Sequence, residues 1–335
     1  MTKTAVVILN YNGEKLLRQF LPSVIQHTRV AEVIVADNGS TDHSLSVLEN
    51  EFPSVRIIRL EKNFGFCGGY NRALKQVESD YYVLLNSDIE VTENWLTPLI
   101  QLLDEDPSIV AVQPKILSYR DKTKFEYAGA GGGFIDALGY PFCRGRIFNH
   151  IETDKGQYND ELEIFWATGA CLMIRSETFT LFGGLDEDLF AHMEEIDLCW
   201  KIHRTGKKVF YCGKSTIYHL GAGTLGYDQP RKIYLNFRNG LTLIFKHLNP
   251  LELMYKLPLR VLLDWVAAGT FLLKGQPGSM MAVLQAHLDF MKDIRRNLAK
   301  RKHLRVTYPN YASNTIHAGL IIYDYYFRQR KIYNQ

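Results

Sequence analysis

A carboxylate that directly follows a short apolar run is the first sign of chemistry in this sequence. The run from Tyr82 to Leu85 leads into Asn86, Ser87 and Asp88. This pattern predicts a buried strand that delivers polar groups to the carboxyl edge of a sheet, where open α/β folds bind ligands. A hard carboxylate oxygen there suits Mg²⁺ or Mn²⁺ bridging a diphosphate. Asp88 is therefore predicted to hold a metal, with capping of the next helix as the alternative.

A second carboxylate lies near the start of a predicted helix, within residues 189–206, that ends with Gly206 as its C′ residue. Glu195 shares a helical face with Leu198, Cys199 and Ile202, so it should point toward the body of the protein. Burial would raise its pKa and make it a better base, whereas the helix N-terminus would lower it. The alternative is a first-turn acid that only complements the helix dipole. Its neighbours form one charged stripe that we expect water to solvate: Glu194, Asp197, Lys201 and Arg204.

Polar residues also follow the other predicted strands. Asn10 and Asn12 close the first strand, and Asp37 opens an Asp-Asn-Gly sequence after the second. The Asp37 carboxylate could accept the N3–H of a pyrimidine base, or it could serve turn chemistry, and both roles are compatible. His219 could supply an imidazole to the metal on Asp88, although a lone histidine is often only hydrogen-bonded.

A glycine-rich segment, residues 63–74, follows the third strand and opens a helix. Its glycines would let backbone N–H groups approach a phosphate or sugar, which makes Asn63, Gly65 and Asn71 candidates for binding such a ligand. The spacing matches neither a dinucleotide fingerprint nor a P-loop, so a plain glycine turn is the alternative. Arg238, in a predicted helix over residues 231–247, suits a diphosphate oxygen through its planar fork, or a surface salt bridge.

The elements that must position these groups alternate along the chain. Four short strands are predicted at residues 6–9, 33–36, 55–60 and 82–85, with helix-length segments after the first three. That order specifies parallel βαβ units, and so an α/β fold with a mostly parallel sheet flanked by helices. Ser40 and Thr41 are predicted to cap the second helix. Residues 118–163 carry many glycines and are expected to form an irregular excursion over one end of the sheet. Loops in that position often select the molecule that a protein acts on.

Composition narrows the class of protein. The chain has 39 Lys and Arg against 36 Asp and Glu, a formal charge of +3. This charge is too small to indicate a nucleic-acid-binding protein. The five cysteines never form a C-x-x-C pair, which gives no support to zinc or a disulfide framework. The apolar run after Thr4 stops at Asn10, too short for a signal peptide, so we expect a reducing cytosol.

The C-terminal region, residues 249–335, differs from the rest. The apolar run at residues 257–273 contains Arg260 and Asp264 and is too short for a membrane span. Many basic residues surround it, and we expect amphipathic helices that lie on the anionic inner face of a membrane. The alternative is a helical hairpin packed on a catalytic domain, residues 1–248, or in a homodimer interface.

Five motifs occur here in a known order: Val7-Ile8-Leu9-Asn10-Tyr11-Asn12, Asp37-Asn38-Gly39-Ser40-Thr41-Asp42, Asn63-Phe64-Gly65, Asn86-Ser87-Asp88 and Glu194-Glu195-Ile196-Asp197. Together they resemble family 2 glycosyltransferases of the GT-A fold, in the rhamnosyltransferase-like bacterial branch. The resemblance covers about residues 4 to 245, and each motif alone is weak.

The resemblance implies roles for these residues. Asn10 and Asn12 would lie at the nucleotide, Asp37 would read the base, and Asp88 would hold the divalent metal of the family's D-x-D site. Asn86 departs from the acidic first position, so it would touch ribose or sugar. Glu195, the second residue of the acidic pair after Glu194, would be the base, and His219 matches a histidine that some relatives use on the metal.

The implied activity is inverting transfer of a sugar from a dTDP or UDP donor, rhamnose among the candidates, to a hydroxyl of a saccharide or lipid-linked glycan in polysaccharide synthesis. Glu195 would deprotonate the acceptor, while the metal and Arg238 would stabilise the departing diphosphate. A sugar nucleotidyltransferase is an alternative, but it would carry a basic glycine-rich loop after the first strand. A non-catalytic nucleotide-sugar-binding subunit is another, although it has no use for an inward Glu195.

Overall fold

The computed structural model describes residues 3–221, 230–310 and 314–333. Its N-terminal part alternates strands and helices as the sequence predicts, and all four predicted strands are present. The elements are β1 (Thr4–Asn10), α1 (Glu14–His27), β2 (Glu32–Asp37), α2 (Ser44–Glu51), β3 (Arg56–Arg59), α3 (Gly65–Leu74) and β4 (Tyr81–Asn86). β1 pairs in parallel with β2 and β4, and β2 pairs in parallel with β3.

The main sheet continues beyond β4 with partners of both directions. Its order is β11-β13-β6-β12-β4-β1-β2-β3, and β5 pairs with β13. The added strands are β5 (Ile89–Val91), β6 (Ile109–Ser118), β11 (Glu161–Ile164), β12 (Cys171–Arg175) and β13 (Lys208–His219). β12 lies antiparallel between β4 and β6, whereas β13 runs parallel to β6. The α/β fold class is confirmed, and the parallel βαβ units form the half of the main sheet that surrounds β1.

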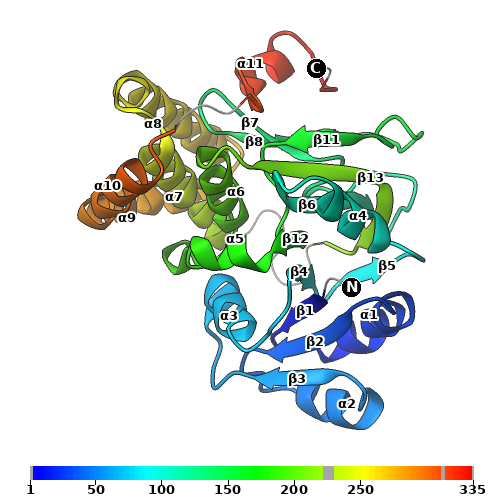
Figure 1. Ribbon diagram of the computed structural model, residues 1–335. Coiled ribbons are helices and arrows are strands. Elements are labelled where there is room, and N and C mark those ends of the chain that lie inside the picture. Colours follow the sequence, from blue (N-terminus) through cyan, green and yellow to red (C-terminus); the bar gives the residue numbers. More distant parts are fainter. Residues whose placement is uncertain (1–2, 222–229, 311–313, 334–335) are drawn as a thin grey trace.

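Helices cover both faces of this sheet (Figure 1). On one face, alternate residues of β1 and β4 pack against α1, α2 and α4 (Thr97–Glu105). On the other face, the intervening residues pack against α3, α5 (Ser176–Leu181) and α6 (Glu194–Arg204). Because successive strand residues point to opposite faces, a strand covered on both sides is apolar throughout, as Val6, Val7 and Ile8 are.

The segment predicted as an irregular excursion is partly ordered, so that prediction is wrong in part. It contributes β7 (Gly133–Asp136), β8 (Pro141–Cys143), β9 (Arg146–Ile147) and β10 (His150–Ile151) to a second sheet. That sheet is completed by β14 (Ile316–His317), which pairs in parallel with β7. Strands of two to four residues are too short to show alternation, and the last partner comes from the far end of the chain.

Two helix starts also differ from prediction. α2 begins at Ser44, where the Asp42 carboxylate accepts a hydrogen bond from the Ser44 backbone N–H at 3.0 Å, so Ser40 and Thr41 do not cap it. α6 begins at Glu194 after a single 3₁₀ turn, Glu187–Leu189. The predicted end holds, because Gly206 follows the helix with φ +75°, the conformation of a C′ glycine.

The C-terminal third is helical and stacks beside α6 (Figure 1). It comprises α7 (Pro230–His247), α8 (Pro250–Leu273), α9 (Pro277–Lys292), α10 (Ile294–Thr307) and α11 (Ile321–Tyr326). Among the residues that the structure describes, no helix is long and apolar enough to cross a membrane. The predicted boundary after residue 248 falls in the turn between α7 and α8. Arg204 nevertheless donates to the carbonyls of His247 and Leu304, both at 3.2 Å, which ties α6 to α7 and α10.

Candidate active site at the carboxyl edge of the sheet

The ends of β1 and β2 bring the first polar groups together. Asn10 lies directly opposite Asp37 in the parallel ladder, and both side chains are fully buried. The Asn10 amide donates to the Asp37 carboxylate at 3.0 Å, while the Asn10 Oδ1 is buried without a partner. A buried amide oxygen without a donor is costly unless a ligand supplies one. This atom therefore marks the edge as a place for a hydrogen-bonding ligand.

Asp37 also builds the turn that follows it. Its second oxygen accepts the backbone N–H of Ser40 at 2.9 Å, as turn chemistry predicts. Asn12 joins the two loops, because its Oδ1 accepts the Thr41 N–H at 2.7 Å and its own N–H donates to the Ser40 hydroxyl at 2.9 Å. Asn12 thus holds the loop after β1 against the loop after β2.

The glycine-rich segment is held by Asn38, a residue that the sequence presented only as part of a turn. The Asn38 amide donates to Asn63 Oδ1 at 3.1 Å and to the Gly65 carbonyl at 3.0 Å. Gly65 has φ +73°, and a Cβ there would lie 2.7 Å from the Phe190 ring, so only glycine fits. Asn71 is used differently, since its amide exchanges two hydrogen bonds with the Leu185 backbone, at 2.8 and 2.9 Å.

Asp88, His219 and Glu126 form a buried triad. Antiparallel pairing of β13 with β5 sets His219 beside the strand end, where its Nε2 lies 3.1 Å from Asp88 Oδ1. Its Nδ1 lies 3.4 Å from Glu126 Oε2, and the Asn86 amide is 3.5 Å from Nε2. Burial alone would lower the pKa of His219, but the two carboxylates outweigh it and raise that pKa to about 10.

A divalent metal fits the donors at this edge. Among the described residues no cluster of three or more His, Cys, Asp or Glu side chains forms a ready metal cage. The edge offers one carboxylate, Asp88, and one imidazole, His219, in contact. A metal bound there would take the place of the proton that His219 carries at neutral pH. That sparse set suits Mg²⁺ or Mn²⁺, which take one or two protein ligands and fill the rest with phosphate oxygens and water. Glu126 on the far nitrogen of His219 is the type of partner that orients a metal-binding imidazole.

The acidic pair sits at the start of α6, close to the same edge. The Asn86 backbone N–H donates to the Ala170 carbonyl at 2.9 Å, and the neighbouring Gly169 N–H faces Glu195. Burial raises the pKa of Glu195 to about 7, and burial together with the charge of Glu195 raises that of Glu194 well above its ordinary range. The Oε2 atoms of both glutamates are buried without a partner. These carboxyls are arranged to hold or take up a proton at neutral pH.

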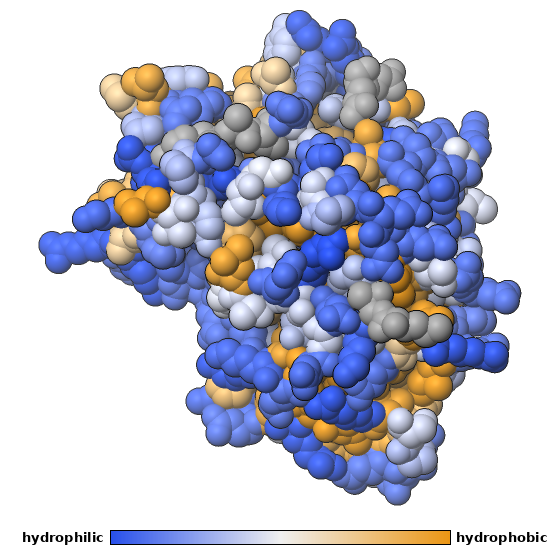
Figure 2. All heavy atoms as spheres, viewed as in Figure 1, coloured by the Kyte–Doolittle hydropathy of each residue, from blue (hydrophilic) through white to orange (hydrophobic). Residues whose placement is uncertain are grey.

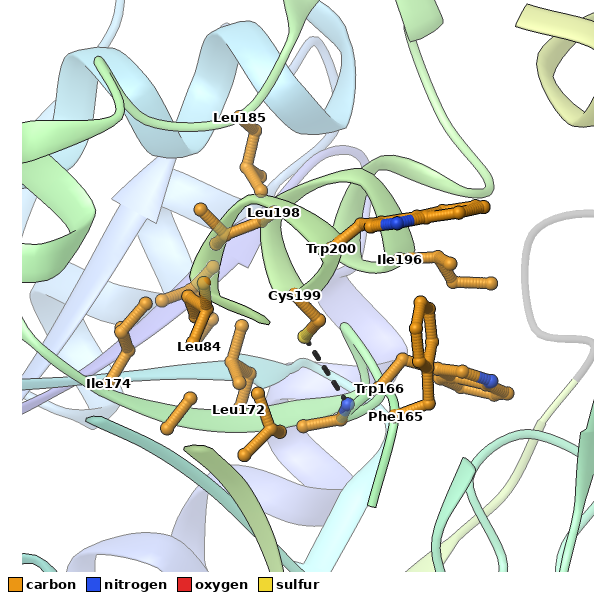
Figure 3. Close-up of a cluster of buried hydrophobic side chains, with 14 of the residues drawn as sticks. Leu84, Phe165, Trp166, Leu172, Ile174, Leu185, Ile196, Leu198, Cys199 and Trp200 are labelled. Carbon is orange, nitrogen blue, oxygen red and sulfur yellow. Dashed lines mark hydrogen bonds between the residues drawn. The ribbon is translucent and has the colours of Figure 1, made fainter. Parts of the chain in front are cut away.

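The inward face of α6 explains why this pair is so well fixed. Figure 3 shows Leu198 and Cys199 directed toward Leu84, Leu172 and Ile174 of the sheet, and the Cys199 thiol accepts the Ala167 N–H at 3.5 Å. The charged stripe was predicted to be solvated, and that is wrong, because Glu194, Asp197, Lys201 and Arg204 are all buried.

The reason for the buried stripe is that α7 and α10 cover it. Asp197 contacts Lys201 at 2.7 Å, Lys246 at 2.6 Å and His247 at 2.8 Å. Lys246 also reaches Asp186 at 2.8 Å. Helical spacing shows that charges share a face, but it does not show which other helix will supply their counter-ions.

The loop before the pair is strained and clamped. Phe190, His192 and Met193 have φ values of 66°, 66° and 72°, a conformation that side chains other than glycine rarely adopt. The Asn239 amide donates to three carbonyls of this loop, those of Leu189 and Ala191 at 3.0 Å and of His192 at 2.7 Å. Asn239 is fully buried on α7, and no sequence motif singled it out.

Arg238 joins the same clamp. Its guanidinium donates to the carbonyls of Asp188 and Leu189, both at 3.0 Å, and to the Asn239 amide oxygen. To bind a diphosphate directly, Arg238 would have to give up some of these hydrogen bonds. The predicted contact with diphosphate stays a prediction. Ser87 lies partly buried beside Asn86, at the end of β4.

Comparison with known proteins gives a consistent result. The family model described as glycosyl transferase family 2 matches residues 5–182. An N-acetylglucosaminyl-diphospho-decaprenol L-rhamnosyltransferase of Mycobacterium tuberculosis is 27% identical over 242 residues, 67% of this chain and 78% of that protein. The low-salt glycan biosynthesis hexosyltransferase Agl10 of Haloferax volcanii is 22% identical over 241 residues, 70% of this chain and 73% of the relative.

Solved structures share the fold. S. aureus TarS 1-349 in complex with UDP-GlcNAc matches with a TM-score of 0.57 at 18% identity, over 99% of this chain and 93% of that one. GalNAc-T7 with UDP, GalNAc and Mn²⁺ matches with a TM-score of 0.59 at 17% identity, over 92% of this chain. This chain spans 58% of that structure's length. At such identities the likeness shows the GT-A fold.

Proposed function

The chain belongs to glycosyl transferase family 2, and from that premise we propose that it is an inverting, metal-dependent hexosyltransferase. The donor would be a dTDP- or UDP-sugar, with rhamnose among the candidate sugars, and the acceptor a hydroxyl of a saccharide or lipid-linked glycan in cell-surface polysaccharide synthesis. The name of the M. tuberculosis relative supports a rhamnosyl donor and a lipid-linked acceptor. UDP-GlcNAc in the TarS structure and UDP in the GalNAc-T7 structure support a nucleotide-sugar donor.

The observation that carries this proposal is the meeting of two carboxylate systems at one sheet edge. Asp88, which contacts His219, follows Asn86 by two residues. The Asn86 N–H donates to the Ala170 carbonyl, and the N–H of the adjacent Gly169 faces Glu195. The first system suits a cation on a diphosphate, and the second suits a proton from a hydroxyl. A transferase needs both, whereas a binding subunit needs only the first.

The chain's own residues would then divide the work. Asp37 and Asn10, with the free Asn10 oxygen, would bind the nucleotide base, and Asn12 would fix the loop around it. Asn63, Gly65 and Asn71 would shape the wall beside the donor, and Asn86 and Ser87 would contact its ribose or sugar. Mg²⁺ or Mn²⁺ held by Asp88 and His219 would neutralise charge on the departing diphosphate.

Glu195 would act on the acceptor. In its ionised form it would take the proton of the acceptor hydroxyl as that oxygen attacks the anomeric carbon from the face opposite the nucleotide. One displacement inverts that centre, and no covalent intermediate on the protein is required. Glu194 would keep the pair's charge low by holding a proton of its own. The clamped loop at residues 189–193 would aim both side chains.

We also propose that the protein works at the cytoplasmic face of a membrane, where a lipid-linked acceptor would be presented. All five cysteines are buried free thiols in the described structure, which suits a reducing compartment. A homodimer is the competing use of the same C-terminal surface.

A thermal-shift panel tests the donor and the metal together. The full-length protein is heated with UDP- and dTDP-sugars, with Mn²⁺ or with chelator. Binding at 100 times Kd stabilises a fold by about 2.7 kcal/mol, which raises the melting temperature by a few degrees. We expect a shift that requires Mn²⁺ in the wild type and is lost in Asp88→Ala. Absence of any shift with every nucleotide sugar, or a shift equal with chelator, contradicts the metal-dependent donor site.

A further inference from the structure

The helix α8 is oriented with its charges toward the protein. Its four charged residues are spaced four apart on one face: Glu252, Lys256, Arg260 and Asp264. They form two ion pairs, Lys256 with Glu252 at 2.6 Å and Arg260 with Asp264 at 2.9 Å. Arg260 and Asp264 are 3% and 0% exposed. An ordinary surface helix turns such residues to water.

Partners in the body of the protein explain this orientation. Arg260 donates to the Leu138 carbonyl at 3.2 Å, and the Tyr140 hydroxyl donates to Asp264 at 3.1 Å, so α8 is fastened to the turn between β7 and β8. His287 of α9 lies 3.3 Å from the second Asp264 oxygen. The inward face is therefore fixed by specific polar contacts, and the orientation of α8 is set.

The outward face of α8 is consequently apolar along its whole length. Its exposed large side chains are Leu251, Met254, Tyr255, Leu259, Leu262, Trp265, Val266, Leu272 and Leu273. None of the exposed residues of α8 carries a charge. The antiparallel neighbour α9 adds Met281, Leu288 and Met291. We call these side chains the α8–α9 apolar face. In the view of Figure 2, apolar spheres show among hydrophilic ones at the upper left, where α8 lies in Figure 1.

The charge around this face selects its occupant. Residues 250–335 contain 13 Lys and Arg against 5 Asp and Glu, although the whole chain has a formal charge of only +3. Lys274 is exposed at the tip of the α8–α9 hairpin, and Arg295 is exposed at the other end of α9. Lys292 and Arg296 are exposed beside Arg295 and also form ion pairs, Lys292 with Asp289 and Arg296 with Asp188 and Asp293. A second copy would bring like charges together, whereas an anionic bilayer opposes them. Trp265 and Tyr255 are side chains that favour a membrane interface.

We propose that the α8–α9 apolar face inserts into the interfacial layer of an anionic phospholipid bilayer, with the hairpin lying in the membrane plane. This inference rests on the proposed function only for its purpose, which is to hold the active site beside a lipid-linked acceptor. The binding itself needs neither donor nor metal. The face is built from α8 and α9, and α7, which carries the Arg238–Asn239 clamp, packs against both.

Tryptophan fluorescence offers a direct readout of insertion. Of the four tryptophans, Trp95, Trp166 and Trp200 are at most 6% exposed, and Trp265 is 52% exposed. The full-length protein is mixed with vesicles of phosphatidylglycerol and phosphatidylcholine, with or without bromine on the acyl chains. We expect brominated anionic vesicles to quench the emission, and Trp265→Phe to lose that quenching. Binding to vesicles of phosphatidylcholine alone should be at least tenfold weaker.

A matched pair of variants tests the face. Val266, on the face, is 57% exposed, and Val30, in the turn before β2, is 59% exposed. Val266→Asp should weaken flotation with anionic vesicles at least tenfold, whereas Val30→Asp should leave it unchanged. Both substitutions add the same charge at similar exposure, so loss of folding is not the expected cause, and circular dichroism checks it.

Each outcome has one meaning. Equal vesicle binding by both variants, or quenching that survives Trp265→Phe, overturns the proposal. So does a wild-type protein that ignores vesicles but forms a dimer that Val266→Asp dissociates in sedimentation. The proposed function can fail independently of this inference. Binding to vesicles without binding of any nucleotide sugar in the presence of Mn²⁺ would support the membrane face and contradict the transferase proposal. Binding of a nucleotide sugar without binding to vesicles would contradict only the membrane face.

Discussion

Replacing Glu195 by glutamine should make the protein more stable and inactive, and the gain in stability should depend on pH. Burial raises the pKa of Glu195 from 4.5 to about 7. Between these values the folded state holds a proton that the unfolded state has released, so this group's contribution to the free energy of unfolding falls as pH rises. One pKa unit corresponds to about 1.36 kcal/mol, so the contribution lost by pH 8 is about 3 kcal/mol.

The sign follows from the direction of the shift. The stabilising contribution is fully present below pH 4.5, and it is lost as pH rises through about 7. Glu195→Gln cannot ionise, so its free energy of unfolding should exceed that of the wild type by about 2 to 3 kcal/mol at pH 8, and by little at pH 5. Loss of the base should lower kcat by about 10² to 10⁴ while donor binding persists.

Urea unfolding at intervals from pH 5 to pH 8.5 measures the first effect, and single-turnover transfer the second. Glu78→Gln, at an exposed glutamate after α3, is the control and should not change the pH dependence. A constant difference between Glu195→Gln and the wild type across this range would refute the buried-proton argument. Unchanged turnover by Glu195→Gln would exclude this residue as the base.

Three further predictions concern the groups around the two carboxylate systems. Asp88→Asn should abolish the Mn²⁺ dependence of nucleotide binding while the fold persists, which calorimetry with and without chelator would show. Glu126→Gln should weaken Mn²⁺ binding about 10- to 100-fold by releasing His219 from its orienting partner, with Mn²⁺ electron paramagnetic resonance as the readout; an unchanged affinity would contradict that role. Asn239→Leu should lower kcat more than it raises KM, because it frees the strained loop before Glu195, and a proportionate loss of stability and activity would instead indicate a purely structural part.

Local patterns in the sequence predicted the strands and the polar residues at their ends. The four apolar runs around β1 and β4 were visible because a strand buried on both faces is continuous in apolar residues. Asn10, Asp37 and Asp88 could be placed together because parallel strands end at a common edge. Helical spacing predicted that Glu195 would be the buried acid of its helix, but every other residue of α6 is buried and Glu195 alone is partly exposed.

The residues that the sequence did not reveal depend on contacts between distant segments. Glu126 lies in a glycine-rich stretch without periodicity, and its significance comes from His219, 93 positions later. Asn239 is distinguished only by the hydrogen bonds that its amide donates to three carbonyls of one loop, which no local pattern in the sequence indicates. The prediction that the charged stripe on α6 is solvated was wrong for the same reason, because α7 supplies counter-ions to that stripe. Periodicity reports which residues share a face, and only the folded chain shows what covers that face.

The contacts of Lys300 bear on how this protein can be shortened. From α10 its ammonium group reaches Asp186 and Asp188, both at 2.5 Å, on the turn just before the clamped loop. Arg301 next to it donates to the Leu248 carbonyl at 2.7 Å, inside the packed interior. A chain truncated after residue 248 would therefore lose cations that its remaining aspartates and carbonyls need, and would expose the interior side of α7. Expression fragments intended for crystallisation or assay should keep all residues through the end of α10, because the last helices complete the folding unit that contains Glu194 and Glu195.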